Sequence, residues 1–149
     1  MLEPLIGSFE WKFKWPPNEA EAVETVGITT NSWDPSKRML VSELRWRRGN
    51  KEEVITRGHY FWNHQDECIE CVTVNPRMGV VTVFKVTDKG SGEFAYSLVK
   101  SSTKMRQFNS DRTVVVKGDE MKVTTIRKDS DGNPLPGTVN TLKRVNASN

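Results

Sequence analysis

The sequence contains few of the residues and segments that mark the large functional classes of protein. It has only 2 cysteines and 2 histidines in 149 residues, too few cysteines for a disulfide framework, so we expect a reduced, cytoplasmic protein. No apolar run approaches the ~20 residues of a transmembrane helix, and we expect no secretory signal. The net charge is only +3, with both signs interspersed. We therefore expect neither nucleic acid nor a membrane as a partner.

The hydrophobic content is also low, but the aromatic residues are numerous. Only 36% of residues are hydrophobic and 28% are charged, yet there are 5 Trp, 6 Phe and 2 Tyr. Disordered chains are poor in such residues. A chain of 149 residues can bury a core without covalent staples, so we predict a single domain over residues 1–149.

Alternation with a period of two is the dominant pattern. Within residues 9–15, every odd-numbered residue is Phe or Trp and every even-numbered residue is Glu or Lys. This pattern predicts a strand with one buried face and one solvated face. Pro16 and Pro17 end it, because proline cannot donate to the sheet ladder. The sequence after them is compatible with a short helical turn over Asn18–Ala22.

Similar segments continue along the chain and are separated by turn residues such as Gly49-Asn50. They predict strands over residues 9–15, 23–32, 39–47, 53–62, 68–74, 80–87, 93–99, 112–117, 120–128 and 137–145. Many short strands are typical of an antiparallel sandwich or barrel. Short hairpins favour a meander, and closure leaves no free edge. The predicted fold is an all-β, up-and-down antiparallel β-barrel of about ten strands.

The first predicted strand carries a resemblance to a known superfamily. Leu5-Ile6-Gly7-Ser8-Phe9 resembles the start of the calycins, which include lipocalins and fatty-acid-binding proteins. Those chains begin with Gly-x-Trp and place a basic residue of the last strand over that aromatic ring. Here Phe9 stands at the Trp position, and Lys143 and Arg144 are the matching basic residues. The resemblance implies that Gly7, Phe9 and Arg144 close one end of the barrel.

The strand pattern of the whole chain resembles the small bacterial lipocalin-like domains and, more distantly, the nitrobindins. Nitrobindin-type haem proteins require a histidine on a late strand, whereas the last histidine of this chain is His64. The resemblance therefore implies no haem, and we expect no cofactor.

One cluster has spacing typical of a metal site. It is His64-x3-Cys68-x2-Cys71, with His59, Asp66 or Glu67 available as a fourth ligand. Zinc requires four ligands that converge tetrahedrally. Residues three apart on a strand point to opposite faces, so we predict ordinary buried or half-buried cysteines and no metal site.

His59 and His64 are the only candidates for a histidine general base. Such a base requires a substrate within hydrogen-bonding reach and an orienting carboxylate, for which Glu43 and Glu70 are available. His59 lies on the predicted face opposite Tyr60, which favours exposure to solvent. The two histidines are therefore weak candidates, and no catalytic residue is assigned.

Basic and aromatic residues are interleaved over Arg45–Lys51, as in some proteins that bind single-stranded nucleic acid by stacking its bases on aromatic side chains. Alternation places Trp46 on the face opposite Arg45 and Arg47, so stacking and phosphate contacts would not share a surface. This segment is better explained as a solvated hairpin end.

The aromatic face of the predicted sheet offers the candidate ligand-binding residues. They are Trp11, Phe13, Trp46, Tyr60, Trp62, Phe84, Phe94 and Tyr96. These side chains either fill the barrel or surround a cavity in it. Our leading hypothesis is non-catalytic binding of a small apolar or aromatic ligand. The alternatives are a barrel enzyme of the isomerase, cyclase or hydrolase type that uses His59 or His64, and an interaction module that acts as a homodimer.

Overall fold

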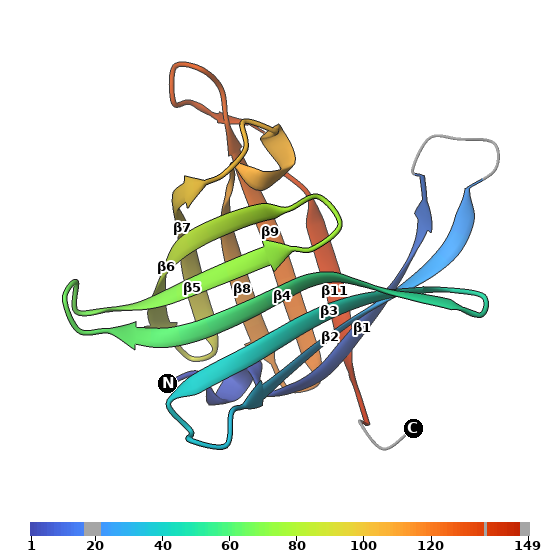
Figure 1. The fold of residues 1–149 in the computed structure, drawn as a ribbon, viewed down its shortest axis with the longest axis horizontal. Coiled ribbons are helices and arrows are strands. Elements are labelled where there is room, and N and C mark those ends of the chain that lie inside the picture. The colour runs from blue at the N-terminus through green and yellow to red at the C-terminus, as the bar shows by residue number, and fades with distance from the viewer. Residues whose placement is uncertain (17–21, 136, 147–149) are drawn as a thin grey trace.

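The protein is an all-β barrel (Figure 1). The computed structural model describes residues 1–16, 22–135 and 137–146, and this part of the chain contains no α-helix. Its elements are η1 (Glu3–Leu5), β1 (Gly7–Trp15), β2 (Val23–Trp33), β3 (Met39–Arg48), β4 (Lys51–Asn63), β5 (Cys68–Asn75), β6 (Val80–Gly90), β7 (Glu93–Ser101), η2 (Arg106–Phe108), β8 (Asp111–Lys117), β9 (Glu120–Lys128), β10 (Pro134–Leu135) and β11 (Val139–Val145), where η denotes a 3-10 turn.

Ten antiparallel strands form a closed ring. Each strand from β1 to β9 pairs with the next one, and β11 lies between β9 and β1. The short β10 pairs only with β9 and is not one of the ten strands of the ring. The predicted fold class is therefore confirmed.

All ten predicted strands are present, with ends that differ by a few residues. The two 3-10 turns and β10 were not predicted, because segments of two or three residues show no periodicity. The helical turn expected over Asn18–Ala22 lies outside the described residues, except for Ala22.

The apolar core includes the turn that covers one end of the barrel. Leu2 directly precedes η1, and Leu5 is its last residue. Both are buried and belong to the same core as Phe9, Leu40 and Phe94. Figure 1 shows η1 at this end, whereas η2 and the hairpin between β9 and β10 lie at the other. The two ends are called the floor and the mouth below.

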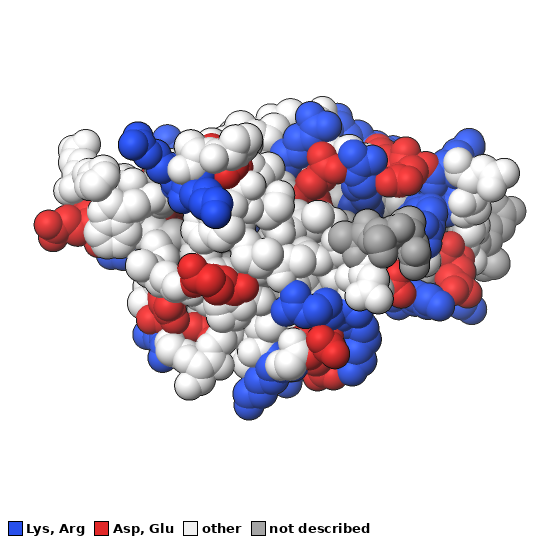
Figure 2. All heavy atoms as spheres, turned by 90° about the horizontal axis from the view of Figure 1, so that it is seen from below, with Lys and Arg blue, Asp and Glu red and all other residues white. Residues whose placement is uncertain are grey.

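The outer face carries charges of both signs. Figure 2, which views the molecule from below, shows Lys and Arg interspersed with Asp and Glu. On β3 and β4, the Glu43 carboxylate accepts hydrogen bonds from Arg45 and Arg57, and Arg45 also donates to Glu52 at 3.1 Å. The basic side chain of Arg45 is thus neutralised by carboxylates. Among the described residues, no helix has the length and apolar character needed to cross a membrane.

Candidate functional site

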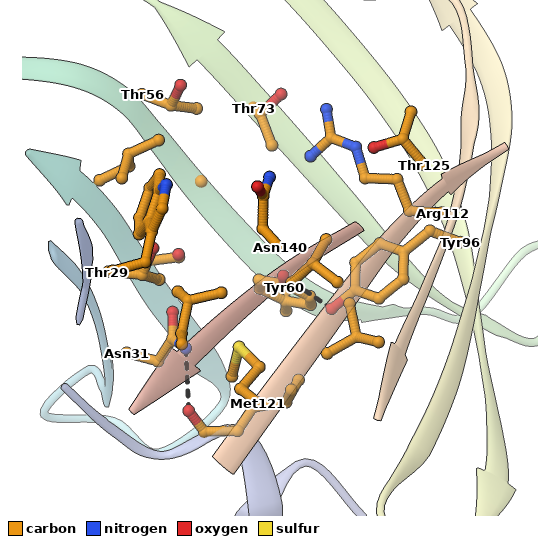
Figure 3. A pocket seen from close by; sticks show the side chains of 18 of the residues that line it. Thr29, Asn31, Thr56, Tyr60, Thr73, Tyr96, Arg112, Met121, Thr125 and Asn140 are labelled. Carbon is orange, nitrogen blue, oxygen red and sulfur yellow. Dashed lines mark hydrogen bonds between the residues drawn. The ribbon is translucent and has the colours of Figure 1, made fainter. Parts of the chain in front are cut away.

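The barrel encloses a cavity of about 270 Å³ (Figure 3). Its lining comes from both halves of the ring and from the segment at the mouth, where Gln107 of η2 contributes. Figure 3 shows labelled polar side chains pointing into this space from several strands. The interior is therefore only partly filled by the core.

Both sides of the cavity combine polar and apolar side chains. Strands β2 to β5 contribute the small hydroxyl-bearing residues Thr29, Ser42, Thr56 and Thr73, together with Leu44. Strands β8, β9 and β11 contribute four apolar and three polar residues, namely Val114, Met121, Val123, Leu142, Arg112, Thr125 and Asn140. A molecule in the cavity would have hydroxyl groups near β2 to β5 and a mixture of hydrocarbon and polar groups opposite them.

Asn31 lines the cavity from β2 and carries an unpaired polar atom. Its side-chain amide donates a hydrogen bond to the carbonyl of Leu5 at 2.8 Å, which ties β2 to η1. The residue is only 5% exposed, and its Oδ1 atom has no hydrogen-bond partner among the described residues. A buried acceptor without a partner is costly, so a donor group in the cavity would stabilise this site.

Two tyrosine hydroxyls meet inside the barrel. The hydroxyl oxygens of Tyr60 on β4 and Tyr96 on β7 lie 2.9 Å apart and share a hydrogen bond. Cys71 is the residue of β5 that pairs with Tyr60 on β4. Burial raises the pKa of both tyrosines well above the ordinary range and raises the pKa of Cys71 to about 12. All three groups are therefore protonated near neutral pH.

Arg112 on β8 lines the cavity as its only Arg, Lys, Asp, Glu or His among the described residues. Its guanidinium lies over the ring of Phe84, with Cζ 4.9 Å from the ring centroid. It takes part in none of the ion pairs that the described residues form. Its positive charge lowers the pKa of Cys71 and Tyr96, against the larger effect of burial. The cavity is thus lined by a cation that has no counter-ion in the described part of the chain.

The structure places the eight predicted ligand-binding aromatics in three different environments. Trp11, Tyr60 and Tyr96 line the cavity. Phe84 and Phe94 are 1% and 0% exposed and belong to the packed core. The remaining three, Phe13, Trp46 and Trp62, do not line the cavity.

Phe13 and Trp46 belong to an aromatic cluster on the extension of the β1–β2 hairpin. The Trp11 and Phe13 rings stack with centroids 5.4 Å apart, and Trp46 contacts Phe13 and Trp15 at 5.1 and 5.3 Å. β1 pairs with β11 only over Ser8–Glu10, while its pairing with β2 continues to Trp15. The cluster therefore starts in the cavity at Trp11 and continues where β1 has left β11.

Trp62 lies at the floor end and lines a separate, smaller pocket of about 160 Å³. Trp33, Phe61 and Lys37 also line this pocket, and Tyr60 lines both pockets. Trp62 is 46% exposed. Its indole is thus a surface group and does not contribute to the main cavity.

His59 and His64 are both exposed. His59 lies between Val41 and Val72 on the outer face of the sheet, and His64 follows β4 in a turn. Neither side chain lines the cavity. The structure does not bring the two candidate bases together with the interior aromatics.

Cys68 and Cys71 are both free and buried. They lie on β5 at positions of opposite parity, so their side chains leave the strand on different faces. No group of three or more His, Cys, Asp or Glu residues suited to a metal ion occurs in the described part of the chain.

The structure brings Gly7, Phe9 and Arg144 into contact. The Arg144 guanidinium lies over the Phe9 ring, 4.5 Å from its centroid, and donates a hydrogen bond to the Ile6 carbonyl at 2.6 Å. A Cβ atom on Gly7 would lie 2.5 Å from this guanidinium, and the φ angle of Gly7 is +121°. Glycine is therefore required here both for space and for backbone conformation.

Sequence reasoning missed Arg112, Asn31 and the threonine residues that line the cavity. A signal for Arg112 was present, since Arg112 lies on the same face of a predicted strand as the apolar residues Val114 and Val116. Asn31 and Thr29 likewise share one parity within β2. Polar residues on an inward face indicate an interior that is not a solid core.

The fold and cavity define a ten-stranded, up-and-down β-barrel with an internal space. Comparison with solved structures finds a similar barrel in Rv2717c from M. tuberculosis, with a TM-score of 0.58 and 16% identity over 97% of this chain and 95% of that chain. This likeness shows a shared fold. No protein-family model matches the chain, and no curated protein matches it either.

Proposed function

We propose that the protein binds a small molecule in the barrel cavity without transforming it. The observation that carries this proposal is the cavity itself, an interior space of about 270 Å³ lined by both apolar and polar side chains. Binding sites for small molecules are concave, mostly apolar and supplied with a few fixed polar groups. Trp11 and Met121 supply apolar surface, and Asn31, Tyr60 and Arg112 supply polar groups.

The chemistry of the lining supports binding rather than catalysis. Among the described lining residues there is no histidine, aspartate or glutamate. The acidic groups in and beside the cavity are the phenols of Tyr60 and Tyr96 and the thiol of Cys71, whose pKa values are raised by burial. A general base works best with a pKa near the working pH, and these groups do not meet that requirement.

A cavity-filling substitution tests the proposal. Gly58 lines the cavity, and a Cβ atom there would have its nearest neighbours at 3.4, 3.6 and 3.7 Å, which is ordinary van der Waals distance. Gly58→Val therefore places its Cβ atom without a clash and adds two methyl groups beside the space. His59→Val, at the adjacent outward position of β4, is the matched control because it adds the same side chain outside the barrel.

Binding of indole and phenol is measured by ligand-observed NMR and titration calorimetry, after native mass spectrometry has recorded any co-purified compound. We expect Gly58→Val to weaken probe binding at least tenfold and to reduce occupancy by a co-purified compound. His59→Val should leave both unchanged. Equal binding by wild type and Gly58→Val, or no binding by any small molecule, would contradict the proposal.

We also propose that the chain is a calycin related to the small bacterial lipocalin-like domains. The contact between Arg144 and Phe9 supports this assignment, because it matches the basic residue over an aromatic ring that the superfamily uses at the end of its barrel. A crystal structure in which Arg144 did not cover Phe9 would contradict it. The two free cysteines support the proposed cytoplasmic location, which cell fractionation tests.

The two alternative functions are a barrel enzyme and a homodimeric interaction module. No observation on the cavity favours an enzyme that uses His59 or His64, since both side chains are exposed. The homodimer stays a prediction, and light scattering on the purified protein tests it.

A further inference from the structure

Arg112 gives the cavity a permanent positive charge. Its side chain is half-buried, and the guanidinium group brings this charge to the cavity lining. Its contact with Phe84, at 4.9 Å from Cζ to the ring centroid, is a cation–π interaction that neutralises no charge. Figure 3 shows the guanidinium pointing toward the interior, on the same side of the view as Thr73 and Thr125. Its donors are suited to an anion, above all to the two oxygens of a carboxylate.

Asn31 supplies the opposite requirement. Its Oδ1 atom is a buried acceptor with no partner among the described residues, because the amide group is oriented by its bond to Leu5 at 2.8 Å. In Figure 3, Asn31 lies beside Met121, away from Arg112. An acceptor in this position is suited to a donor such as a hydroxyl group, because a buried acceptor without a partner is destabilising.

The remaining lining limits the size and shape of the ligand. A cavity of about 270 Å³ lies just below the usual range of small-molecule sites, roughly 300–1,000 Å³, which favours a compact ligand. Trp11 presents an aromatic ring on one side, while Thr29 and Thr56 present hydroxyl groups. This combination suits a planar ring with polar substituents.

We propose, on the basis of the binding function above, that the cavity selects a small hydroxylated aromatic acid. Arg112 binds the carboxylate, Asn31 Oδ1 accepts a hydrogen bond from the hydroxyl group, and Trp11 packs against the ring. The ligand is therefore recognised by two polar groups at a fixed separation, and removal of either group weakens binding.

The probes are three hydroxy acids in which the separation of carboxylate and hydroxyl increases, namely 4-hydroxybenzoate, 4-hydroxyphenylacetate and 4-hydroxycinnamate. Benzoate, phenylacetate and cinnamate lack the hydroxyl group. 4-Hydroxyphenylacetamide and tyramine replace the carboxylate by a neutral amide and by a cation. Titration calorimetry measures the dissociation constant of each compound.

We expect one hydroxy acid of the series to bind at least tenfold more tightly than its hydroxyl-free counterpart and than the neutral amide, with tyramine weakest. Arg112→Gln should remove the preference for acid over amide, and Arg112→Lys should retain part of it because a lysine keeps the charge without the planar fork. Arg47→Gln, at an exposed position of β3, is the control for the change in net charge. Asn31→Leu should remove the preference for the hydroxylated acid while the preference for acid over amide remains.

These readouts are ratios of affinities within one variant, so a modest loss of stability does not mimic them. The inference is overturned if no acid of the series binds, if the amide or tyramine binds as tightly as the acids, or if Arg112→Gln leaves the ratios unchanged. Charge-independent binding that Gly58→Val weakens would overturn this inference and leave the proposed function standing. Binding that does not respond to Gly58→Val would overturn both.

Discussion

The hydroxyl oxygens of Tyr60 and Tyr96 lie 2.9 Å apart, at the end of side chains that are 36 residues apart in the sequence. Their hydrogen bond joins β4 to β7 through the interior, although neither strand pairs with the other. The rings also meet edge to face, with centroids 6.1 Å apart. Both side chains line the cavity and also belong to the packed core.

Removing both of these hydroxyl groups should lower the free energy of unfolding by less than the sum of the two single removals. In Tyr60→Phe or Tyr96→Phe, the remaining buried hydroxyl loses its partner, and we expect a loss of about 1–2 kcal/mol in each single variant. The double variant should lose less than the sum, because no unpaired hydroxyl remains. Guanidinium unfolding at pH 7 measures the four free energies of unfolding. Additive losses would show that the two hydroxyls do not stabilise each other.

The buried thiol predicts a loss of stability in alkaline solution. The pKa of Cys71 is raised by burial from 9.0 to about 12, so above pH 9 the unfolded chain loses this proton while the folded chain keeps it. The stabilisation of the folded state by the protonated Cys71 thiol is therefore fully present below pH 9 and is lost progressively between pH 9 and pH 12. The total loss in the free energy of unfolding is on the order of 4 kcal/mol.

Between pH 8.5 and 10.5, the free energy of unfolding should therefore fall more steeply for the wild type than for Cys71→Ala. Denaturant titrations at several pH values give both slopes. Identical slopes would mean that Cys71 is not held protonated by the fold.

Arg144 should contribute substantially to stability at the floor of the barrel. Arg144→Ala removes both the contact with Phe9 and the hydrogen bond to the Ile6 carbonyl, and a charged hydrogen bond of this kind contributes about 1.5–3 kcal/mol. Lys143→Ala is the matched control on the same strand, because its partner Glu120 is exposed and exposed ion pairs contribute little. Thermal unfolding should show a clear loss for Arg144→Ala and almost none for Lys143→Ala. Equal losses would contradict a special role for Arg144.

The packing of Trp11 on the backbone predicts a coupled pair. A Cβ atom on Gly27 would lie 2.4 Å from two atoms of the Trp11 ring, so Gly27→Ala displaces the indole or the strand and should cost about 1–3 kcal/mol. Combining it with Trp11→Leu should recover most of that loss, because the clash disappears. Gly58→Ala, where the nearest atom would be 3.4 Å away, should change stability little. A loss that persists in the Trp11→Leu background would show that Gly27 is needed for another reason.

Local patterning was sufficient to predict the strands. Each strand alternates between an apolar and a polar face, and this period depends only on the geometry of extended backbone. The contact between Phe9 and Arg144 was anticipated by resemblance rather than by periodicity. Arg112 was detectable as an arginine on an apolar face, but its lack of a counter-ion depends on which strands surround β8.

Alternation did not predict how deep each aromatic side chain lies. Phe13 and Trp62 occupy aromatic positions of their strands, as Tyr60 does, yet one lies on the hairpin extension and the other at the exposed floor. Parity is a property of one strand, whereas depth along the axis depends on the stagger between neighbouring strands in the closed ring.

The sequence by itself determined an all-β barrel with aromatic residues on one face of its strands, because alternation and turn residues act locally. Only the tertiary structure decided whether those aromatics fill the barrel. Phe84 and Phe94 pack in the core, while Trp11, Tyr60 and Tyr96 surround a space that Thr and Ser side chains of β2 to β5 are too small to occupy. That outcome depends on the summed side-chain volume at each level of a ring of ten strands, which closure alone brings together.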